Sequence, residues 1–588
     1  MSRRTAAKSL PSRAEIDAPD PPARTAGPPP AALARLEAAI EELKALTVAP
    51  LLRQAIDALR ADDAKAGSEW ALKALNQDER SGPAWYVLAV ARERAGDFAS
   101  SLQAYGSALA LLPDETAVAH DLGRLAYRMG EKNMAEQLFR RYLAAHPTSH
   151  EAINNLACAI HDQGRHPEAI ELLRRGLEHN PADPALWNTL GSVVTEQGDT
   201  EAAFAFFDEA LRLDPSFAKA RYNRGNARLV LGELEAALTD CETALGHVHD
   251  ASDRAMMRLA RSTILLCLGR IEDGWEEYEA RLDPHYAGVT HFLVHVPRWS
   301  PDTDLGGKTL LLMGEQGLGD EVLFANVVPD VLEALGPHGK MVLAVEPRLV
   351  SLMQRSFPDV EVVAHATHKV SGKTVRGAAA VEDRTDIDLW APVASLLRRF
   401  RRRIEDFPAR TGFLTPDAGR VRHWRAALAK APAGRKVGLL WKSMKLDASR
   451  ARYFSPFELW APVLTTLGAS FVNIQYGDCA PEIAWAQTSL GVSLWTPPGI
   501  DLKDDLDDIA ALASALDLTI GFANATSNIA AAVGAPTWII SAPGAWTRVG
   551  ADRMPWYPQA RVFAPPGFRR WRETMSEVAG ALAQSLAS

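Results

Sequence analysis

Small, bulky and helix-breaking residues recur along the first half of the chain with a period of 34 residues. Glycines mark the period at Gly96, Gly130, Gly164, Gly198 and Gly232, and prolines mark it at Pro113, Pro147, Pro181 and Pro215. Each glycine suits a tight turn between two helices, and each proline ends the second helix. Between them, one repeat position is always small (Ala135, Ala169, Ala203, Ala237) and its neighbour bulky (Tyr105, Phe139, Leu173, Phe207). The pattern predicts stacked helix pairs that bury their apolar faces on one another.

A helix–turn–helix period of this length resembles the tetratricopeptide-repeat (TPR) family. The resemblance covers residues 50–284, where a last unit at Gly269 and Pro284 is out of step and a degenerate first unit has Asp62 at the glycine position. Before it, residues 31–49 are expected to form an amphipathic helix, and residues 1–30 a disordered tail rich in proline and charge. Stacked repeats of this family leave a concave groove that binds peptides.

Asparagines stand on the first helix of several repeats, nine or ten residues before the turn glycine: Asn154, Asn155, Asn188 and Asn223. An amide both donates and accepts hydrogen bonds, so a row of them can hold a peptide backbone without recognising its sequence. The row resembles the asparagine ladder of the TPR protein O-GlcNAc transferase. It is partial, because Val87, Asp121 and Thr189 take corresponding places. We expect these asparagines to bind an acceptor polypeptide; a solvated polar face is the alternative.

After Pro284 the pattern changes to short apolar runs between helical segments, at residues 308–315, 340–346, 436–441, 470–476, 517–522 and 536–541. Such alternation favours parallel sheets covered on both faces. We predict two α/β halves, residues 300–415 and 435–588, joined by GRVRHWRAALAKAPAGRK and separated by a cleft, which is the GT-B arrangement. The predicted fold class is therefore an all-α TPR superhelix followed by a double, Rossmann-like α/β domain.

Composition and charge argue against a nucleic-acid binder, a secreted protein and a membrane protein. The net charge of −9 and the pI near 6.0 argue against a general nucleic-acid binder, which carries a basic face. The N-terminus has no apolar signal region and no segment is long and apolar enough to span a membrane, so we expect a cytoplasmic protein. The four cysteines lack C-x-x-C or zinc spacing and are expected to be buried thiols.

A glycine-rich turn follows the first apolar run, in LLLMGEQGLGDEVLFANVVPDV. It places backbone amides and a helix N-terminus at the cleft, where a phosphate is favoured. It is not a Walker A loop, because no lysine follows the glycines. Nor is it a dinucleotide fingerprint, because Gly314, Gly317 and Gly319 are wrongly spaced. The alternative is a tight strand–helix turn in which Asp320 caps the helix.

The string G-x-x-G-L-G-D, followed by an apolar helix and a proline, resembles the heptosyltransferase-like GT-B proteins. In that family the aspartate is the proposed general base, which takes the proton of the acceptor hydroxyl. The resemblance gives this role to Asp320 and places Gly317 and Gly319 beside the donor. An aspartate of ordinary pKa, about 3.9, is a weak base unless burial raises that pKa.

Cations cluster after the run that ends at Trp441, at Lys442, Lys445, Arg450 and Arg452. At the carboxyl edge of a parallel sheet they would face the cleft and neutralise a phosphate leaving group without metal. In the resembling family such a loop contacts the donor phosphate. The string R-Y-F-S-P-F is similar to its R-S-x-P-L, which favours Arg452 beside Lys442. A solvated basic loop is the alternative.

The segment ALDLTIGFANATSNIAAAVGAPTWIIS resembles the family's L-D-L-V-I-S-V-D-T-S-x-A-H-L-A-G-A-L-G-x-P-V-W. The resemblance places Asn524, Thr526, Ser527 and Asn528 at a helix N-terminus that contacts the donor. Asn524 replaces the family's aspartate and Asn528 its histidine, which implies a different donor or weakened chemistry. Gln475, in FVNIQYGD, fits the strand near the nucleotide base.

Asp505 and Asp507 form a D-x-D string, the metal motif of another glycosyltransferase class. They lie at a predicted helix start, where acidic residues stabilise the helix dipole. We therefore expect no metal, and no cofactor other than a nucleotide-sugar co-substrate.

Together these interpretations favour a protein O-glycosyltransferase whose TPR groove holds a polypeptide while the cleft glycosylates its Ser or Thr. The combination resembles bacterial TPR-glycosyltransferases, among them flagellin glycosyltransferases that use a CMP-activated nonulosonic acid such as pseudaminic acid. The expected partners are flagellin and the nucleotide-sugar. Two alternatives remain: a glycan or lipid glycosyltransferase that docks through its repeats, and a non-enzymatic scaffold or chaperone with a decayed transferase domain.

Overall fold

The computed structural model describes residues 46–370, 373–443 and 453–587, and divides into two compact units, Met1–Leu125 and Ala126–Ser588. The predicted tail, residues 1–30, and most of the predicted helix at 31–49 lie outside the described residues. Residues 46–60 are helical. The repeats thus begin in the first unit and continue into the second.

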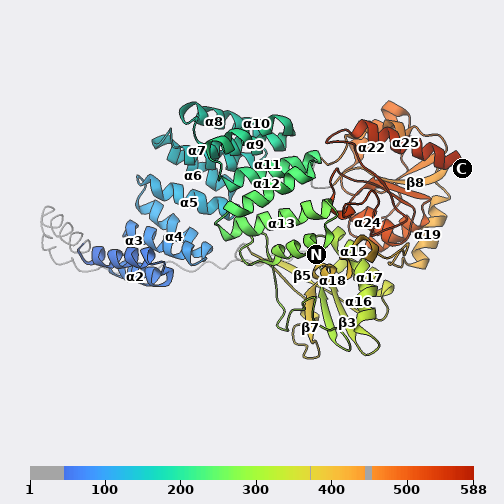
Figure 1. The fold of residues 1–588 in the computed structure, drawn as a ribbon, viewed down its shortest axis with the longest axis horizontal. Helices are drawn as coiled ribbons and strands as arrows, with labels where there is room; N and C mark the ends of the chain where they lie inside the picture. Colours follow the sequence, from blue (N-terminus) through green and yellow to red (C-terminus); the bar gives the residue numbers. More distant parts are fainter. Residues whose placement is uncertain (1–45, 371–372, 444–452, 588) are drawn as a thin grey trace, which may run out of the picture. The chain divides into compact units, whose positions relative to one another are not determined.

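Paired helices fill the first half of the chain, and within the second unit α7 to α13 stack side by side (Figure 1). The predicted turn glycines, together with Gly269, have φ between 77° and 93°, and Asp62 has φ 61°. This left-handed conformation ends a helix and favours glycine. The recurring alanines are fully buried, so the predicted repeats are confirmed. The helices are α2 (Ala64–Gln77), α3 (Gly82–Arg94), α4 (Phe98–Leu111), α5 (Thr116–Arg128), α6 (Lys132–Ala145), α7 (His150–His161), α8 (His166–His179), α9 (Pro184–Gln197), α10 (Thr200–Leu213), α11 (Ala218–Leu231), α12 (Leu234–His247), α13 (Ala251–Cys267) and α14 (Ile271–Tyr278), followed by η1 (Glu279–Leu282).

Two parallel sheets form the α/β part. The first has the order β4-β3-β2-β7 and the second β12-β11-β10-β8-β9. A small third sheet pairs β1, β6 and β5. All six predicted apolar runs are strands, while the missed strands are short or polar. The strands are β1 (Thr290–Phe292), β2 (Thr309–Met313), β3 (Lys340–Val345), β4 (Glu361–Ala364), β5 (Ala366–Val370), β6 (Lys373–Gly377), β7 (Leu389–Pro392), β8 (Arg435–Leu440), β9 (Ala469–Asn473), β10 (Leu518–Phe522), β11 (Thr537–Ile540) and β12 (Arg561–Phe563).

Helices separate these strands, as the predicted fold class requires. They include α15 (Leu318–Phe324), α16 (Val328–Leu335), α17 (Val350–Ser356), α18 (Leu397–Phe400), α19 (Ala418–Leu428), α21 (Ala461–Leu464), α22 (Ala480–Leu490), α23 (Leu506–Ala515), α24 (Ala525–Ala532) and α25 (Trp571–Ala587). The predicted connection between the halves contains α19. Its Val421 and Trp424 pack in one apolar cluster with Ile474 and Leu512 of the second half. The connection is therefore a packed part of that half.

The end of the repeats shares its apolar core with the α/β part. Trp275 of α14 packs with Phe324 and Trp556 in one buried cluster, and its ring centroid lies 6.1 Å from that of Trp546. The Trp275 indole N–H donates to the Arg401 carbonyl at 2.9 Å. The last repeat and the α/β part therefore pack against each other through one continuous apolar core.

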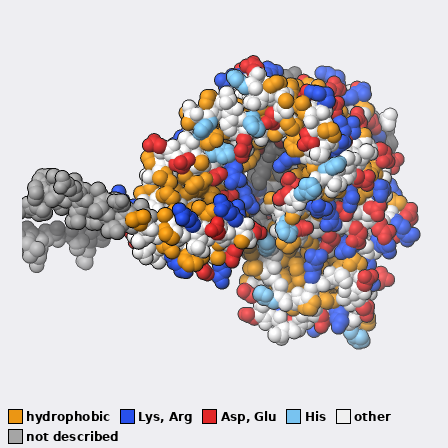
Figure 2. Space-filling view, turned by 60° about the vertical axis from the view of Figure 1, so that its left-hand side comes forward, with side chains coloured by type: hydrophobic (Ala, Val, Ile, Leu, Met, Phe, Trp, Pro, Cys, Tyr) orange, Lys and Arg blue, Asp and Glu red, His pale blue; other side chains and the backbone are white. Residues whose placement is uncertain are grey.

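In Figure 2, Lys and Arg are interspersed with Asp and Glu over the visible face. Within the described residues, no helix combines the length and the apolar character needed to cross a bilayer. All four cysteines are free thiols; Cys241 and Cys267 are buried, and Cys158 and Cys479 are partly exposed.

Candidate functional site

The glycine-rich turn lies between β2 and α15 in the strand–turn–helix arrangement that was predicted. Gly314 has no room for a side chain, because a Cβ there would meet the Glu321 carboxylate at 2.7 Å and the Ala344 carbonyl at 3.0 Å. Gln316 has φ 60°, which is uncommon for a residue with a side chain. Close packing around the turn therefore fixes its shape.

Asp320 lies in the first turn of α15, and one of its carboxylate oxygens accepts a hydrogen bond from the Gly317 amide at 3.1 Å. Burial raises the pKa of Asp320 to about 6, and the charges of Glu315 and Glu321 act in the same direction. A carboxylate of this pKa is a better proton acceptor than an ordinary aspartate. The bond to Gly317 also makes Asp320 a helix cap, so the role of general base stays a prediction.

Two tyrosines that the sequence analysis missed lie near Asp320. Burial raises the pKa of Tyr557 and of Tyr278, and the negative charge of Asp320 contributes to both shifts. The Tyr557 hydroxyl is buried and has no hydrogen-bond partner among the described residues. Tyr278 comes from the last repeat and Tyr557 from a loop after β11. No local motif marks either residue, because only the fold brings them to Asp320.

The segment after β10 forms the N-terminus of α24. The Asn524 amide donates to Ser527 Oγ at 2.9 Å, and the Ser527 amide donates to Asn524 Oδ1 at 3.2 Å, which completes a capping box. Thr526 and Ser527 are buried. The Asn524 side-chain nitrogen is also buried and has no partner among the described residues. Asn524 therefore offers a donor to a ligand, while Ser527 uses its hydroxyl within the cap.

The two halves meet where α15 faces α24. The Asn528 side-chain nitrogen donates to the Gly319 carbonyl at 2.9 Å. A Cβ on Gly319 would lie 3.2 Å from the Ala525 amide nitrogen, so glycine permits this approach. The glycine-rich turn of one sheet and the helix N-terminus of the other, which the sequence placed in separate motifs, thus form one site.

Lys442 and Gln475 lie at the carboxyl ends of β8 and β9, and β8 is the neighbour of β10. Gln475 Oε1 accepts from the amides of Trp441 and Lys442, at 3.0 and 2.9 Å, and is buried. The Lys442 ammonium is ion-paired with Glu482 of α22. Lys442 would have to break its ion pair with Glu482 to bind a phosphate. The Gln475 side-chain oxygen is already hydrogen-bonded to backbone amides. The predicted donor residue Arg452 lies outside the described residues.

A buried ion pair joins the last repeat to the glycine-rich turn. The Arg281 guanidinium donates to both carboxylate oxygens of Glu315, at 2.7 and 2.8 Å, and both side chains are almost fully buried. Glu315 also accepts from the Ala394 amide at 2.8 Å. Ser395 Oγ accepts from Arg281 and donates to Glu279. Sequence reasoning missed this pair, because its members lie in segments that it assigned to different domains.

The predicted acceptor-binding asparagines lie on α7, α9 and α11, and three of them bond between consecutive repeats. Asn154 accepts from Thr189 at 2.6 Å, and the Asn223 side-chain nitrogen donates to Asn188 at 2.8 Å. Asn188 is buried, whereas Asn155 is half-buried. The row is therefore partly engaged in holding repeats together, and its contact with a polypeptide stays a prediction.

The D-x-D string is a helix start, as expected. Asp505 accepts from the Asp508 amide at 3.0 Å and caps α23. Asp507 is ion-paired with Arg355 at 2.7 Å. Both acids are thus accounted for by helix capping and ion pairing.

A TPR family model matches residues 120–184, 162–216 and 189–255. Protein FlbA of Caulobacter vibrioides is 50% identical over 557 residues, which cover 95% of this chain and 93% of that protein. The chain belongs to the FlbA family. Because 557 residues exceed the length of either part, the relationship to FlbA extends over the repeats and both α/β halves.

Among solved structures, the chain is similar to repeat proteins. A TPR protein from Parabacteroides merdae matches 40% of this chain and 91% of its own length, with 16% identity and a TM-score of 0.37. A TPR protein of Thermus thermophilus matches 32% of this chain and 100% of its own length, with 22% identity and a TM-score of 0.29.

Proposed function

We propose that this FlbA-family chain transfers a sugar from a nucleotide-sugar to Ser or Thr of a protein held by the repeats. The proposed donor is a CMP-activated sugar. Flagellin is the proposed acceptor, and the cytoplasm the proposed location. The donor occupies the region between the glycine-rich turn and the N-terminus of α24. Asp320 then takes the proton of the acceptor hydroxyl as that hydroxyl attacks the sugar, and the bond from the sugar to the phosphate oxygen breaks, so that the nucleotide leaves with the bonding electrons.

The meeting of the two motifs at Gly319 and Asn528 carries this proposal. It brings Asp320, with its raised pKa, into the same site as Asn524, whose buried side-chain nitrogen has no partner among the residues that the structure describes. A buried donor without a partner is costly unless a ligand accepts from it. A proton acceptor beside a helix N-terminus that could hold the donor phosphate supports a role in glycosyl transfer to a hydroxyl.

A non-catalytic scaffold is the second candidate, and specific contacts favour it. Lys442 is paired with Glu482, Gln475 accepts from backbone amides, and Ser527 bonds with Asn524 in its own cap and with the Phe522 carbonyl. Each of these predicted donor contacts is therefore satisfied without a ligand. On this alternative the repeats bind a partner protein and the α/β halves have kept only their structure.

The intact mass of the flagellar filament protein tests the proposal. It should be measured in cells that carry the native gene, that lack it, or that express Asp320→Asn instead. A loss of mass in sugar units without the gene, restored by the native chain and not by Asp320→Asn, is the expected result. An unchanged flagellin mass with altered lipid glycans would show that the acceptor is a lipid or glycan and not flagellin. Unchanged glycans throughout would favour the scaffold.

A further inference from the structure

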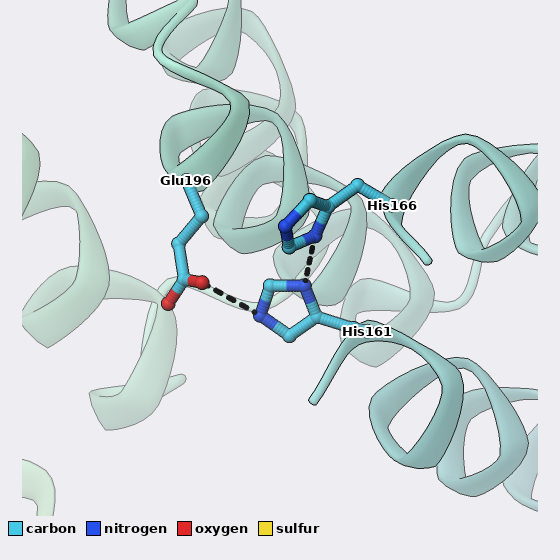
Figure 3. A group of neighbouring side chains, drawn as sticks. All are labelled: His161, His166 and Glu196. Carbon is cyan, nitrogen blue, oxygen red and sulfur yellow. Dashed lines mark hydrogen bonds and ion pairs between the residues drawn. The ribbon is translucent and has the colours of Figure 1, made fainter. Parts of the chain in front are cut away.

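Two histidines and a glutamate from consecutive repeats come together at the turn edge of the repeats (Figure 3). His161 ends α7, His166 begins α8, and Glu196 lies next to the end of α9. One possible ligand atom of each lies within 4.8 Å of the others. His161 and His166 are separated by four residues, a spacing that zinc-binding histidines also show, but only the stacking of repeats brings Glu196 to the two imidazoles.

We infer that His161, His166 and Glu196 form a divalent transition-metal site, with zinc as the expected ion. Ligand atoms around a tetrahedral zinc, each about 2.0–2.2 Å from the ion, lie about 3.3 Å apart. The His161 and His166 Nδ1 atoms are 2.9 Å apart, and His161 Nε2 is 3.3 Å from a Glu196 carboxylate oxygen. These two contacts use opposite nitrogens of the His161 ring, so binding of one ion requires the His161 ring and the Glu196 side chain, which is 38% exposed, to rotate.

The chemistry of the group selects the ion. Two imidazole nitrogens and one carboxylate suit zinc, whereas calcium and magnesium prefer oxygen ligands. The facing Nδ1 atoms share a hydrogen bond in the structure, and a bound ion would replace it. A water molecule would complete the fourth position.

Such an ion would clamp two repeats together where they meet the second α/β half. It would join the α7–α8 turn to the end of α9. Two residues beyond Glu196, Gly198 lies against the Arg569 guanidinium. The site lies in the repeats and not at the glycine-rich turn, so its test does not depend on glycosyl transfer.

The test is zinc binding by the tag-free, full-length chain after treatment with a chelator and dialysis. Metal analysis and calorimetry with zinc chloride should give one zinc per chain and a higher melting temperature with the ion. His161→Asn and Glu196→Gln should each weaken affinity at least about 10-fold, since even the loss of a residue that only orients a ligand costs about 10- to 100-fold.

His179→Asn is the matched control, because His179 also lies on α8 and is exposed. Among the described residues, its side chain is hydrogen-bonded to the Arg175 carbonyl alone. It should bind zinc as the native chain does. A native chain that takes up no zinc would overturn the inference, as would equal affinity in both variants. The three residues would then be a hydrogen-bonded chain from His166 through His161 to Glu196. Because Glu196→Gln changes only a half-exposed carboxylate, it remains informative if His161→Asn misfolds.

Discussion

At the scale of single residues, the identity of a polar side chain indicates its chemistry but not its partner. Lys442 is a cation at a sheet edge, yet its ammonium is paired with Glu482. Asp320 was expected to need burial in order to act as a base, and burial does raise its pKa to about 6. Its bond to Gly317 equally supports a helix cap. The structure is therefore compatible with two roles for Asp320, a general base and a helix cap. The substitution Asp320→Asn distinguishes between them.

Asp320→Asn should lower transfer to the acceptor about 10²- to 10⁴-fold, because it removes the proton acceptor. In the native enzyme, the rate should rise as the pH increases through about 6, since only the deprotonated carboxylate accepts a proton. Helix α15 should persist, because Asn caps a helix about as well as Asp. Rates measured from pH 5 to 8, with the flagellin and donor of the proposed reaction, check both expectations.

Asp505→Asn provides the control, since Asp505 caps α23 and lies outside the proposed site. It should transfer at the native rate with an unchanged pH profile. If Asp320→Asn also keeps the native rate, the base assignment is wrong and Asp320 is a structural cap.

At the scale of elements, polar contacts link neighbouring repeats and link the repeats to the turn. Tyr127 donates to Asp162, and Asn223 to Asn188, each across 35 residues of sequence. One repeat further along, Arg281 of η1 is bonded to Glu315 in the glycine-rich turn. The end of the repeats therefore holds the turn that carries the candidate base.

Glu315→Gln should destabilise the second unit by about 1–3 kcal/mol, because it weakens two hydrogen bonds of the buried Arg281 guanidinium, which keeps Glu279 at 2.8 Å as its remaining counter-charge. Replacing both residues by apolar ones, in Arg281→Met with Glu315→Leu, should recover part of that loss. Denaturant-unfolding midpoints compare the variants.

Arg402→Gln is the matched control at the same junction. Arg402 pairs with Glu272 of α14, and both side chains are about half exposed. Its loss should change the midpoint little, because exposed pairs contribute little. An effect of Glu315→Gln no larger than that of Arg402→Gln would show that the buried pair does not hold the junction.

At the scale of the whole molecule, the end of the repeats and the α/β part share one apolar core. The compact units divide at Leu125, and α13 and α14 contribute Leu266, Ile271 and Trp275 to the core of the α/β part. Cys267 also donates its thiol to the Gly544 carbonyl at 2.7 Å. A fragment cut at 284 would expose these apolar side chains to water, which is unfavourable.

A fragment of residues 50–284 should therefore keep α6 to α12 folded, since stacked repeats need only their neighbours, but lose protection at α14. Hydrogen exchange should show fast exchange of the α14 amides in this fragment. The same amides should be slow in the full chain and in a fragment of residues 112–588, which keeps the second unit intact. Equal protection of α14 in all three would contradict the shared core.

The sequence by itself determined the features that depend on near neighbours. The 34-residue period predicted the repeats, because each unit packs on the next. Six apolar runs predicted the principal strands, and the glycines predicted the tight turns between helices. The tertiary structure decided which distant groups meet: Asn528 with Gly319, Arg281 with Glu315, and Glu196 with two histidines. It also decided the pKa of Asp320, because burial and nearby charge arise only when separate segments pack together.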